Sequence, residues 1–420
     1  MGHHLLFIGG EDHSLRLPFL TALASRGYRI TTAASDDPAP FERAGIEYIH
    51  FDFNRFWDPR SDLRAWRKIG QILADVDADV VHSFDTKLSI LTPYASRFNP
   101  RTIIVRTING RAWTFSSRSF GALLLRVVLY RPVQFLASMT TAAIVFEQRD
   151  DQAFFERNGL IGKGESVAIP GAGIDVRGFE EARKSGPSVE SLRTELGLIG
   201  ADVVITVTRV TREKGILDLL KAAELVHRDR PSVKFLIVGP RRGEGPFAIT
   251  DDELAPYSEY VIATGSRKDV PSLLAMSDVF AFPSDYAEGV PRALMEAALC
   301  GMPIVTTDKP GCMEVVRDGW NGYVTPARDP SAMAKRILDL LNDRAAGARM
   351  GALGPDLIKS AFSLDKVVDQ HAALYERLLC KRRSKGADKR ELSDHSRDSS
   401  EAPQQVEIDR RQLSERQDAL

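Results

Sequence analysis

Cysteine is scarce in this chain of 420 residues. The three cysteines are Cys300, Cys312 and Cys380, an odd number without the spacing of metal ligands. This pattern disfavours both a disulfide framework and a cysteine-based metal cluster. A protein of the reducing cytosol is therefore expected.

The chain also lacks an excess of charge of one sign. The 56 Lys and Arg residues balance 57 Asp and Glu residues, and the formal net charge is −1. A globally basic surface for nucleic acid is excluded by this balance, although a local basic patch is not. We expect no nucleic-acid partner.

Long uninterrupted apolar runs are missing as well. The most membrane-like stretch, residues 120–139, is broken by Arg126, Arg131 and Pro132, so it does not resemble a spanning helix. The N-terminus lacks the pattern of a secretory signal peptide. The apolar fraction of 43% and the charged fraction of 27% are those of a soluble globular protein.

What the chain contains is a regular alternation of short apolar runs and helical patterns. This alternation predicts mostly parallel sheets covered by helices, an α/β fold whose ligands bind beyond the carboxyl ends of the strands. The predicted strands are residues 4–8, 28–33, 80–82, 102–107 and 142–146, followed by 203–208, 234–238, 260–263, 279–282 and 304–306.

Composition shifts divide the chain into five segments. Turn formers and polar residues between the two series of strands predict an interdomain linker. The last forty residues hold ten basic and nine acidic side chains and cannot bury a core, which predicts a disordered tail. The predicted segments are a first domain at 1–175, the linker at 176–200, a second domain at 201–362, a helix at 363–380 packing back toward the first domain, and the tail at 381–420.

A pair of carboxylates follows the predicted strand 279–282. Glu288 lies in a loop, and Glu296 lies further along a helix that begins near Pro291. Free amides in this first turn, such as those of Gly289 and Val290, favour an anion, typically a phosphate. A carboxylate can accept two hydrogen bonds from a vicinal diol, so the arrangement suits a nucleotide sugar. The alternative is a surface loop residue and a helix-face partner of a nearby base.

A basic cluster follows the predicted strand 203–208 and opens a helix. Arg209 and Lys214 would project from the carboxyl end of the strand, where a diphosphate can accept bidentate bonds from Arg and a point charge from Lys. The glycine pattern of a Walker loop is absent. A solvated turn with surface charges is the alternative.

Together these segments resemble glycosyltransferase family 4. Arg209-x4-Lys214-Gly215 is similar to the family's R-x4-K-G element, and Glu288-x7-Glu296 matches its E-x7-E signature. Residues 107–115, 145–151 and 169–175 resemble the subgroup that extends undecaprenyl-diphosphate-linked oligosaccharides for bacterial surface polysaccharides and glycans. The resemblance covers about residues 3–379 and excludes the tail.

The resemblance implies a GT-B fold, in which two Rossmann-like domains face a cleft. It also implies a retaining transferase without a bound metal or other cofactor. Arg209, Lys214 and Glu288 would form the catalytic set, with the two cations stabilising the leaving diphosphate, Glu288 touching the sugar and Glu296 holding the ribose hydroxyls. The predicted donor-binding residues are Gly9, Gly10, Arg209, Lys214, Gly265, Ser266, Glu288, Gly289, Val290 and Glu296.

The first domain is predicted to bind the acceptor. Residues 86–146 hold eight Lys or Arg and no Asp or Glu, and a basic, strongly apolar segment suits an anionic leaflet or a lipid diphosphate. A core helix with a basic outer edge is the alternative. The acceptor-side candidates are His82, Asn109, Arg111 and Arg118. Asn109 stands where many family members carry His, and His82 could instead be a satisfied buried histidine.

We therefore predict a glycosyltransferase, peripheral on the cytosolic face of the membrane. It would move a hexose or N-acetylhexosamine from a nucleotide-diphosphate sugar, with UDP the expected nucleotide, to a polyprenyl-diphosphate-linked saccharide. The competing predictions are a sugar-nucleotide epimerase or phosphorylase of similar fold and a catalytically silent binding module. The absence of a G-x-G-x-x-G fingerprint disfavours a dinucleotide oxidoreductase.

Overall fold

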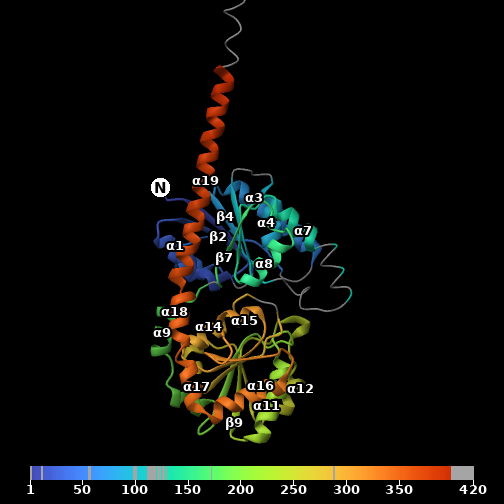
Figure 1. The fold of residues 1–420 in the computed structure, drawn as a ribbon, viewed down its shortest axis with the longest axis vertical. Helices are drawn as coiled ribbons and strands as arrows, with labels where there is room; N and C mark the ends of the chain where they lie inside the picture. Colours follow the sequence, from blue (N-terminus) through green and yellow to red (C-terminus); the bar gives the residue numbers. More distant parts are fainter. Residues whose placement is uncertain are drawn as a thin grey trace, which may run out of the picture. The chain divides into compact units, whose positions relative to one another are not determined.

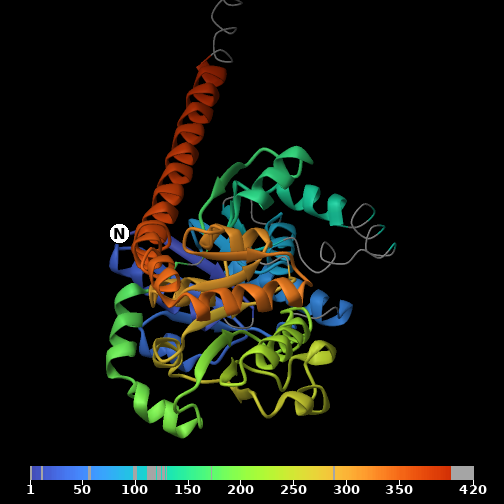
Figure 2. The ribbon, with the colours of Figure 1, turned by 60° about the horizontal axis from the view of Figure 1, so that its bottom comes forward.

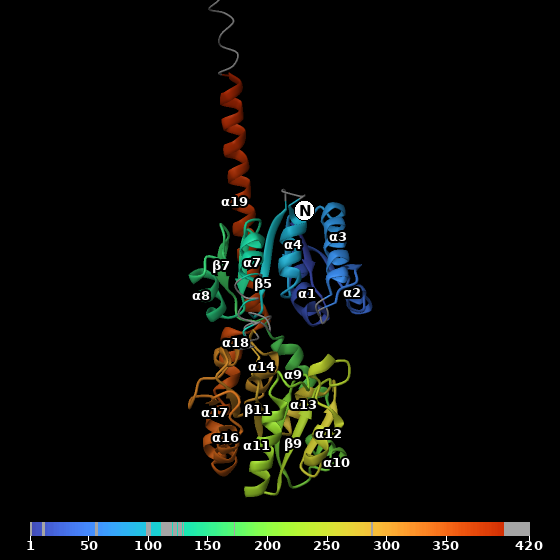
Figure 3. The ribbon, with the colours of Figure 1, turned by 90° about the vertical axis from the view of Figure 1, so that its right-hand side faces the viewer.

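The computed structural model describes residues 2–10, 13–54, 58–97, 102–110, 120, 124, 128, 130–171, 173–286 and 289–398. The chain forms two compact units, residues 1–371 and residues 372–420. The first unit contains two parallel sheets with helices on their faces (Figures 1 and 3). The predicted pair of Rossmann-like sheets is confirmed.

Seven strands form the first sheet, in the order β3-β2-β1-β4-β5-β6-β7. They are β1 (His4–Ile8), β2 (Arg29–Ala34), β3 (Glu47–His50), β4 (Val80–Ser83), β5 (Ile103–Ile108), β6 (Ala143–Phe146) and β7 (Glu165–Ala168). The helices are η1 (His13–Arg16), α1 (Leu17–Ser25), α2 (Ala39–Arg43), α3 (Pro59–Asp75), α4 (Leu88–Ser96), α7 (Arg131–Ser138) and α8 (Arg149–Arg157). The central strands are fully buried, which explains their continuous apolar runs.

The second sheet has six strands in the order β10-β9-β8-β11-β12-β13. They are β8 (Asp202–Val207), β9 (Val233–Val238), β10 (Val261–Gly265), β11 (Val279–Phe282), β12 (Ile304–Thr307) and β13 (Gly322–Thr325). The segments that follow or separate them are α11 (Ile216–Asp229), η3 (Gly245–Phe247), α12 (Asp251–Leu254), η4 (Ala255–Tyr257), α13 (Val270–Ala275), α14 (Arg292–Leu299), α15 (Pro310–Val315), α16 (Pro330–Asn342), α17 (Arg344–Gly351) and α18 (Gly354–Ala361).

Two apolar cores cover the two faces of this second sheet. One contains buried side chains of α11 and α16, such as Leu219 and Ile337, and α16 crosses the sheet in Figure 2. The other contains side chains of α13, α14 and α18, such as Leu274 and Leu294. Because both faces are covered, the strands leave only their ends for a ligand.

The segment expected to be a linker forms two helices, α9 (Val176–Ser185) and α10 (Val189–Glu195). Asp175 and Ser188 cap them by accepting backbone N–H groups of Gly178 and Ser191. Phe179 and Leu192 are buried in the core of the second sheet. The apolar side chains of these two short helices therefore pack on the second sheet. The polar residues between the helices are what led to the prediction of a linker.

The final helix is longer than expected. It begins at Leu364 and runs to Asp398 as α19 (Leu364–Asp398), so it includes residues 381–398 of the segment expected to be disordered. That stretch is rich in Lys and Arg, which have good helix propensity, and it lacks proline. The remaining residues of the predicted tail lie outside the described part of the chain.

Candidate active site

The basic segment after β8 and the loop after β11 lie against each other at the carboxyl end of the second sheet. The backbone N–H of Asp285 donates to the carbonyl oxygen of Glu213 over 3.2 Å. Gly215 has φ +71°, and a β-carbon there would lie 2.0 Å from the Pro283 carbonyl oxygen, so only glycine fits this close approach. The two sequence motifs are thereby brought together, because β8 and β11 are neighbours in the sheet.

Lys214 is held inside this junction. Its side chain is buried, and Nζ lies 5.5 Å from the centroid of the Tyr286 ring. Tyr286 belongs to the loop after β11, two residues before Glu288. The cation is therefore aimed at the loop that carries the predicted sugar contact rather than at bulk solvent.

Arg209 follows the end of β8 and is about one-third exposed. Its Nη1 donates to Glu244 Oε2 over 3.1 Å, and the Glu244 carboxylate is nearly buried. An anion that reaches Arg209 would compete with this carboxylate for the guanidinium. Glu213 lies between the two cations in sequence, and burial raises the pKa of its carboxyl, an effect that Arg209 and Lys214 oppose.

The E-x7-E segment is described in part. Glu288 lies outside the described residues. Glu296 is on α14, largely buried, and its Oε1 accepts a 2.8 Å hydrogen bond from Nε of Arg292. The N–H of Gly289 donates to the Asn109 carbonyl oxygen over 3.1 Å, so this amide is already engaged within the chain.

The two glycines of the Gly9-Gly10 turn have contacts within the protein that explain why glycine is needed there. The Gly9 N–H donates to the Ala33 carbonyl oxygen over 3.0 Å, and the Gly10 N–H donates to Asp85 Oδ2 over 2.7 Å. A β-carbon on Gly10 would lie 2.6 Å from the Phe53 ring. Both amides therefore already have partners within the protein, as in an ordinary tight turn between a strand and a helix, and the donor-binding role of Gly9 and Gly10 stays a prediction.

Gly265 and Ser266 lie at the carboxyl end of β10. Gly265 has φ +74°, a conformation that favours glycine, and its carbonyl oxygen accepts the Gly239 N–H over 2.9 Å. Ser266 is exposed. Their position at a strand end fits the predicted donor role, which stays a prediction.

The acceptor-side candidates divide into two groups. Arg111 and Arg118 lie outside the described residues. His82 is 1% exposed, and its Nε2 lies 2.7 Å from Thr107 Oγ1. Burial holds the pKa of His82 well below its ordinary value, with smaller contributions from His371 and Arg16. This environment is that of the buried histidine named as the alternative, and a substrate contact at His82 stays a prediction.

Sequence reasoning missed a charged group at the carboxyl edge of the first sheet. Glu147 follows β6 and lies 3.7 Å from Arg16 of η1, and the Arg16 guanidinium lies 3.9 Å from the centroid of the Phe84 ring. Asp85, with φ +66°, follows β4 at the same edge. The signal was Glu147 itself, a charged residue directly after the predicted strand 142–146, at the place where such sheets bind ligands.

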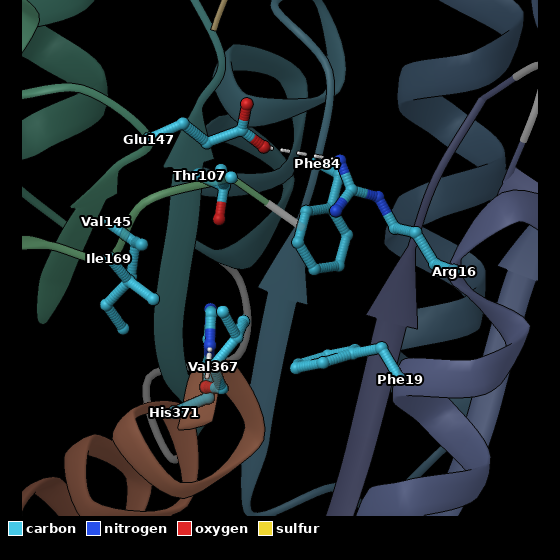
Figure 4. A pocket seen from close by; sticks show the side chains of 10 residues that line it. Arg16, Phe19, Phe84, Thr107, Val145, Glu147, Ile169, Val367 and His371 are labelled. Carbon is cyan, nitrogen blue, oxygen red and sulfur yellow. Dashed lines mark hydrogen bonds and ion pairs between the residues drawn. The ribbon is translucent and has the colours of Figure 1, made fainter. Parts of the chain in front are cut away.

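A pocket adjoins this group. Its lining residues are Arg16, Phe19, Phe84, Thr107, Val145, Glu147, Ile169, Gly171, Val367 and His371. Figure 4 shows Arg16 and Glu147 facing each other across it. Within the described residues, no group of three or more His, Cys, Asp or Glu side chains is arranged to hold a metal ion.

Two family models match the chain. The model "Glycosyl transferases group 1" matches residues 201–343, and "Glycosyltransferase Family 4" matches residues 18–157. The first match contains all six strands of the second sheet, and the second match contains β2 to β6 of the first sheet but not β1 and β7. The residues that the resemblance singled out after β8 and β11 fall within the first of these matches.

Curated relatives match over nearly the whole chain at low identity. Spore coat protein SA of Bacillus subtilis is 24% identical over 391 residues, which cover 88% of this chain and 96% of the relative. The N,N'-diacetylbacillosaminyl-diphospho-undecaprenol alpha-1,3-N-acetylgalactosaminyltransferase of Campylobacter jejuni is 22% identical, with coverages of 88% and 97%.

A solved structure shares the fold. HepE of Anabaena, crystallised in complex with UDP-glucose, matches with a TM-score of 0.73 and 23% identity. The match covers 89% of this chain and 99% of HepE. At this identity the likeness establishes the two-sheet architecture and not the ligand.

Proposed function

The chain belongs to the group 1, family 4 glycosyltransferases, and from this premise we propose the reaction that it catalyses. It transfers a hexose or N-acetylhexosamine from a nucleotide-diphosphate sugar, with UDP as the nucleotide, to a polyprenyl-diphosphate-linked saccharide. The anomeric configuration is retained. The observation that carries the proposal is the contact between the Lys214–Gly215 segment and the loop after β11.

Charge stabilisation by the protein supports the donor side of this proposal. Negative charge builds on the diphosphate as the glycosidic bond breaks, and cations that are already in place lower that barrier. Lys214 is buried beside Tyr286, and Arg209 can exchange Glu244 for phosphate oxygens. The UDP-glucose complex of the structurally similar HepE makes UDP the first nucleotide to test.

The proposed acceptor is supported by the name of one relative and by the basic character of residues 86–146. The Campylobacter jejuni relative is named for a diphospho-undecaprenol acceptor. In this chain, residues 86–146 contain eight basic and no acidic side chains. A basic segment of the first sheet's domain suits the diphosphate of such an acceptor.

We expect UDP to raise the melting temperature selectively among UDP, GDP, ADP, CDP and NAD, measured by thermal shift in EDTA. A ligand at about 100 times its Kd stabilises the folded state by about 2.7 kcal/mol. The Lys214→Ala variant should lose this shift. A shift with GDP alone would redirect the donor to a GDP-sugar, and no shift with any nucleotide would contradict a preformed donor site.

A peripheral membrane contact is proposed at α7. Phe135 and Leu136 are 48% and 39% exposed on this helix, Met139 directly after it is 61% exposed, and Arg131 is exposed at its start. Apolar side chains beside basic ones suit the interface of an anionic leaflet. Among the described residues, no helix has the length and apolar character needed to cross a membrane.

The double substitution Phe135→Ser and Met139→Ser should weaken binding to phosphatidylglycerol-containing vesicles by at least about tenfold. Fully burying one such side chain is worth about 1.5–3 kcal/mol, so two partly buried ones exceed the 1.4 kcal/mol of a tenfold change. Vesicle flotation measures the effect. Ile199→Ser, which removes a 74% exposed apolar side chain elsewhere, is the matched control. Equal binding by wild type and double variant would exclude α7 as the contact.

A further inference from the structure

The guanidinium of Arg209 already has an anionic partner within the protein. Its Nη1 donates to Glu244 Oε2 over 3.1 Å. The side chain of Arg209 is 37% exposed, whereas that of Glu244 is 9% exposed. Among the described residues, Glu244 is the hydrogen-bond partner of this guanidinium, so a carboxylate occupies the cation that is proposed to bind the donor diphosphate.

The loop between β9 and α12, two elements labelled in Figure 3, presents Glu244 to Arg209. Glu244 lies between Gly243 and Gly245, whose φ values of +85° and +70° favour glycine. Backbone hydrogen bonds tie both sides of the loop to the segment after β8. They run from the N–H of Val210 to the carbonyl oxygen of Pro240 over 2.8 Å, from Arg212 to Phe247 over 2.9 Å, and from Ile249 to Val210 over 3.1 Å. Because Arg209 belongs to the same segment, the fold itself holds the carboxylate against the guanidinium.

A diphosphate that binds Arg209 has to compete with Glu244. Phosphate and carboxylate oxygens accept hydrogen bonds from the same N–H groups of a guanidinium. Two anions on one guanidinium also repel each other, because they lie close together. The Glu244 carboxylate is nearly buried, and separating such a carboxylate from its cation is unfavourable. Nucleotide binding therefore includes this cost, and nucleotide release recovers it.

We propose that Glu244 is an internal counter-anion that sets the affinity of the donor site. It holds Arg209 while the site is empty, and the diphosphate displaces it when a nucleotide binds. After transfer, the return of Arg209 to Glu244 favours the departure of the UDP product, a step that limits turnover in many enzymes. The inference rests on the proposed function, because it requires the diphosphate to bind Arg209.

The variant Glu244→Gln tests the inference in the full chain. A glutamine amide keeps the shape of the side chain and a hydrogen-bond acceptor but carries no charge. We expect the Kd for UDP to fall by about tenfold, since a hydrogen bond to a charged group is stronger than a neutral one by about this factor. Titration calorimetry in EDTA measures the Kd. The inhibition constant of UDP should fall by the same factor in transfer from a UDP-sugar to a short polyprenyl-diphosphate-linked N-acetylglucosamine, the acceptor probe.

Two further variants separate the ion pair from a general effect of charge. In the Arg209→Ala background, adding Glu244→Gln should change the Kd for UDP by less than about threefold, because the carboxylate then has no guanidinium to withhold. Asp251→Asn removes the same charge from α12, where the side chain is 84% exposed and pairs with Arg241. This control should also leave the Kd within about threefold of wild type, since an exposed ion pair contributes little.

The outcomes separate the inference from the function on which it rests. A Kd for Glu244→Gln that stays within about threefold of wild type, or exceeds it, would overturn the inference, and an increase would indicate that Glu244 orients Arg209 for the donor. An equal tightening in the Arg209→Ala background would overturn it as well, since the effect would not depend on the ion pair. Both results leave the glycosyltransferase intact. If wild type does not bind UDP, the proposed donor fails and the inference fails with it.

Discussion

Lys214→Ala and Arg209→Ala should each lower the rate of glycosyl transfer by about 10²–10³-fold. Removing one preorganised group that stabilises transition-state charge commonly has this effect. Lys214 is held by burial and by its place beside Tyr286, so it needs little reorganisation to meet the diphosphate. Steady-state transfer from a UDP-sugar to the acceptor probe measures both losses.

The matched control for these two variants is Arg212→Ala. Arg212 lies between them in sequence, but its side chain is exposed and pairs with Glu253. Its removal should change transfer by less than about threefold, since a surface ion pair of this kind contributes 0–1 kcal/mol. A loss below threefold for both Arg209→Ala and Lys214→Ala would contradict their role at the diphosphate.

The free energy of unfolding should fall as the pH is lowered below about 6.5. Three histidines are buried under the first sheet's helices, and burial is the main cause of a lowered pKa in each. The value is about 3 for His13, about 4 for His371, and well below the ordinary value for His82. The unfolded chain therefore binds protons at these rings before the folded chain does, and stability is lost as the pH falls.

The buried carboxyl of Glu147 changes the pH dependence of stability in the opposite direction. The pKa of Glu147 is raised to about 7, so the folded state binds its proton first and gains stability as the pH falls from about 7 to 4.5. Each group changes the stability by up to about 1.4 kcal/mol per pH unit. Among the fully buried groups, the three histidines outweigh this carboxyl, so we expect a net loss of stability on acidification.

The variant His13→Gln isolates one histidine. The His13 ring bonds Thr32 Oγ1 through Nε2, and a glutamine amide can replace that contact without titrating. The slope of unfolding free energy against pH between about 6 and 4 should decrease by about 1.4 kcal/mol per pH unit. Urea unfolding at several pH values measures it. The same substitution at the half-exposed His50 is the control, and equal slopes for wild type and His13→Gln would exclude the linkage.

The strands that the sequence failed to predict are all edge strands. β3 and β7 bound the first sheet, and β13 bounds the second. Their residues are half-buried or exposed in several places, so they lack the continuous apolar runs of central parallel strands. A continuous apolar run indicates a strand that is buried on both faces. An edge strand is partly exposed, so it lacks such a run.

The candidate site residues that the sequence singled out have a local signal. The R-x4-K-G and E-x7-E elements each follow a buried strand, and the structure places the Lys214 segment and the loop after β11 together because β8 and β11 are neighbours. Glu147 lies in the segment 145–151 that carries the resemblance, but it was not singled out, because the sequence does not show that Arg16 lies beside it. For His82 the sequence left both a substrate contact and a buried histidine open, because a histidine near a strand end gives no indication of whether its ring faces the core or the ligand.

The sequence by itself determined that the chain contains two series of alternating strands and helices. It also determined where their central strands lie along the chain and which family the chain belongs to. These features depend on short stretches of sequence, in which the pattern of apolar residues and the spacing of motifs can be recognised. Only the tertiary structure decided that Arg16 lies beside Glu147, that Glu147 contacts Gly289, and that three histidines are buried close to one another. Such contacts depend on which strands become neighbours and on the direction in which each side chain points. Both are set by the packing of residues that are far apart in the sequence.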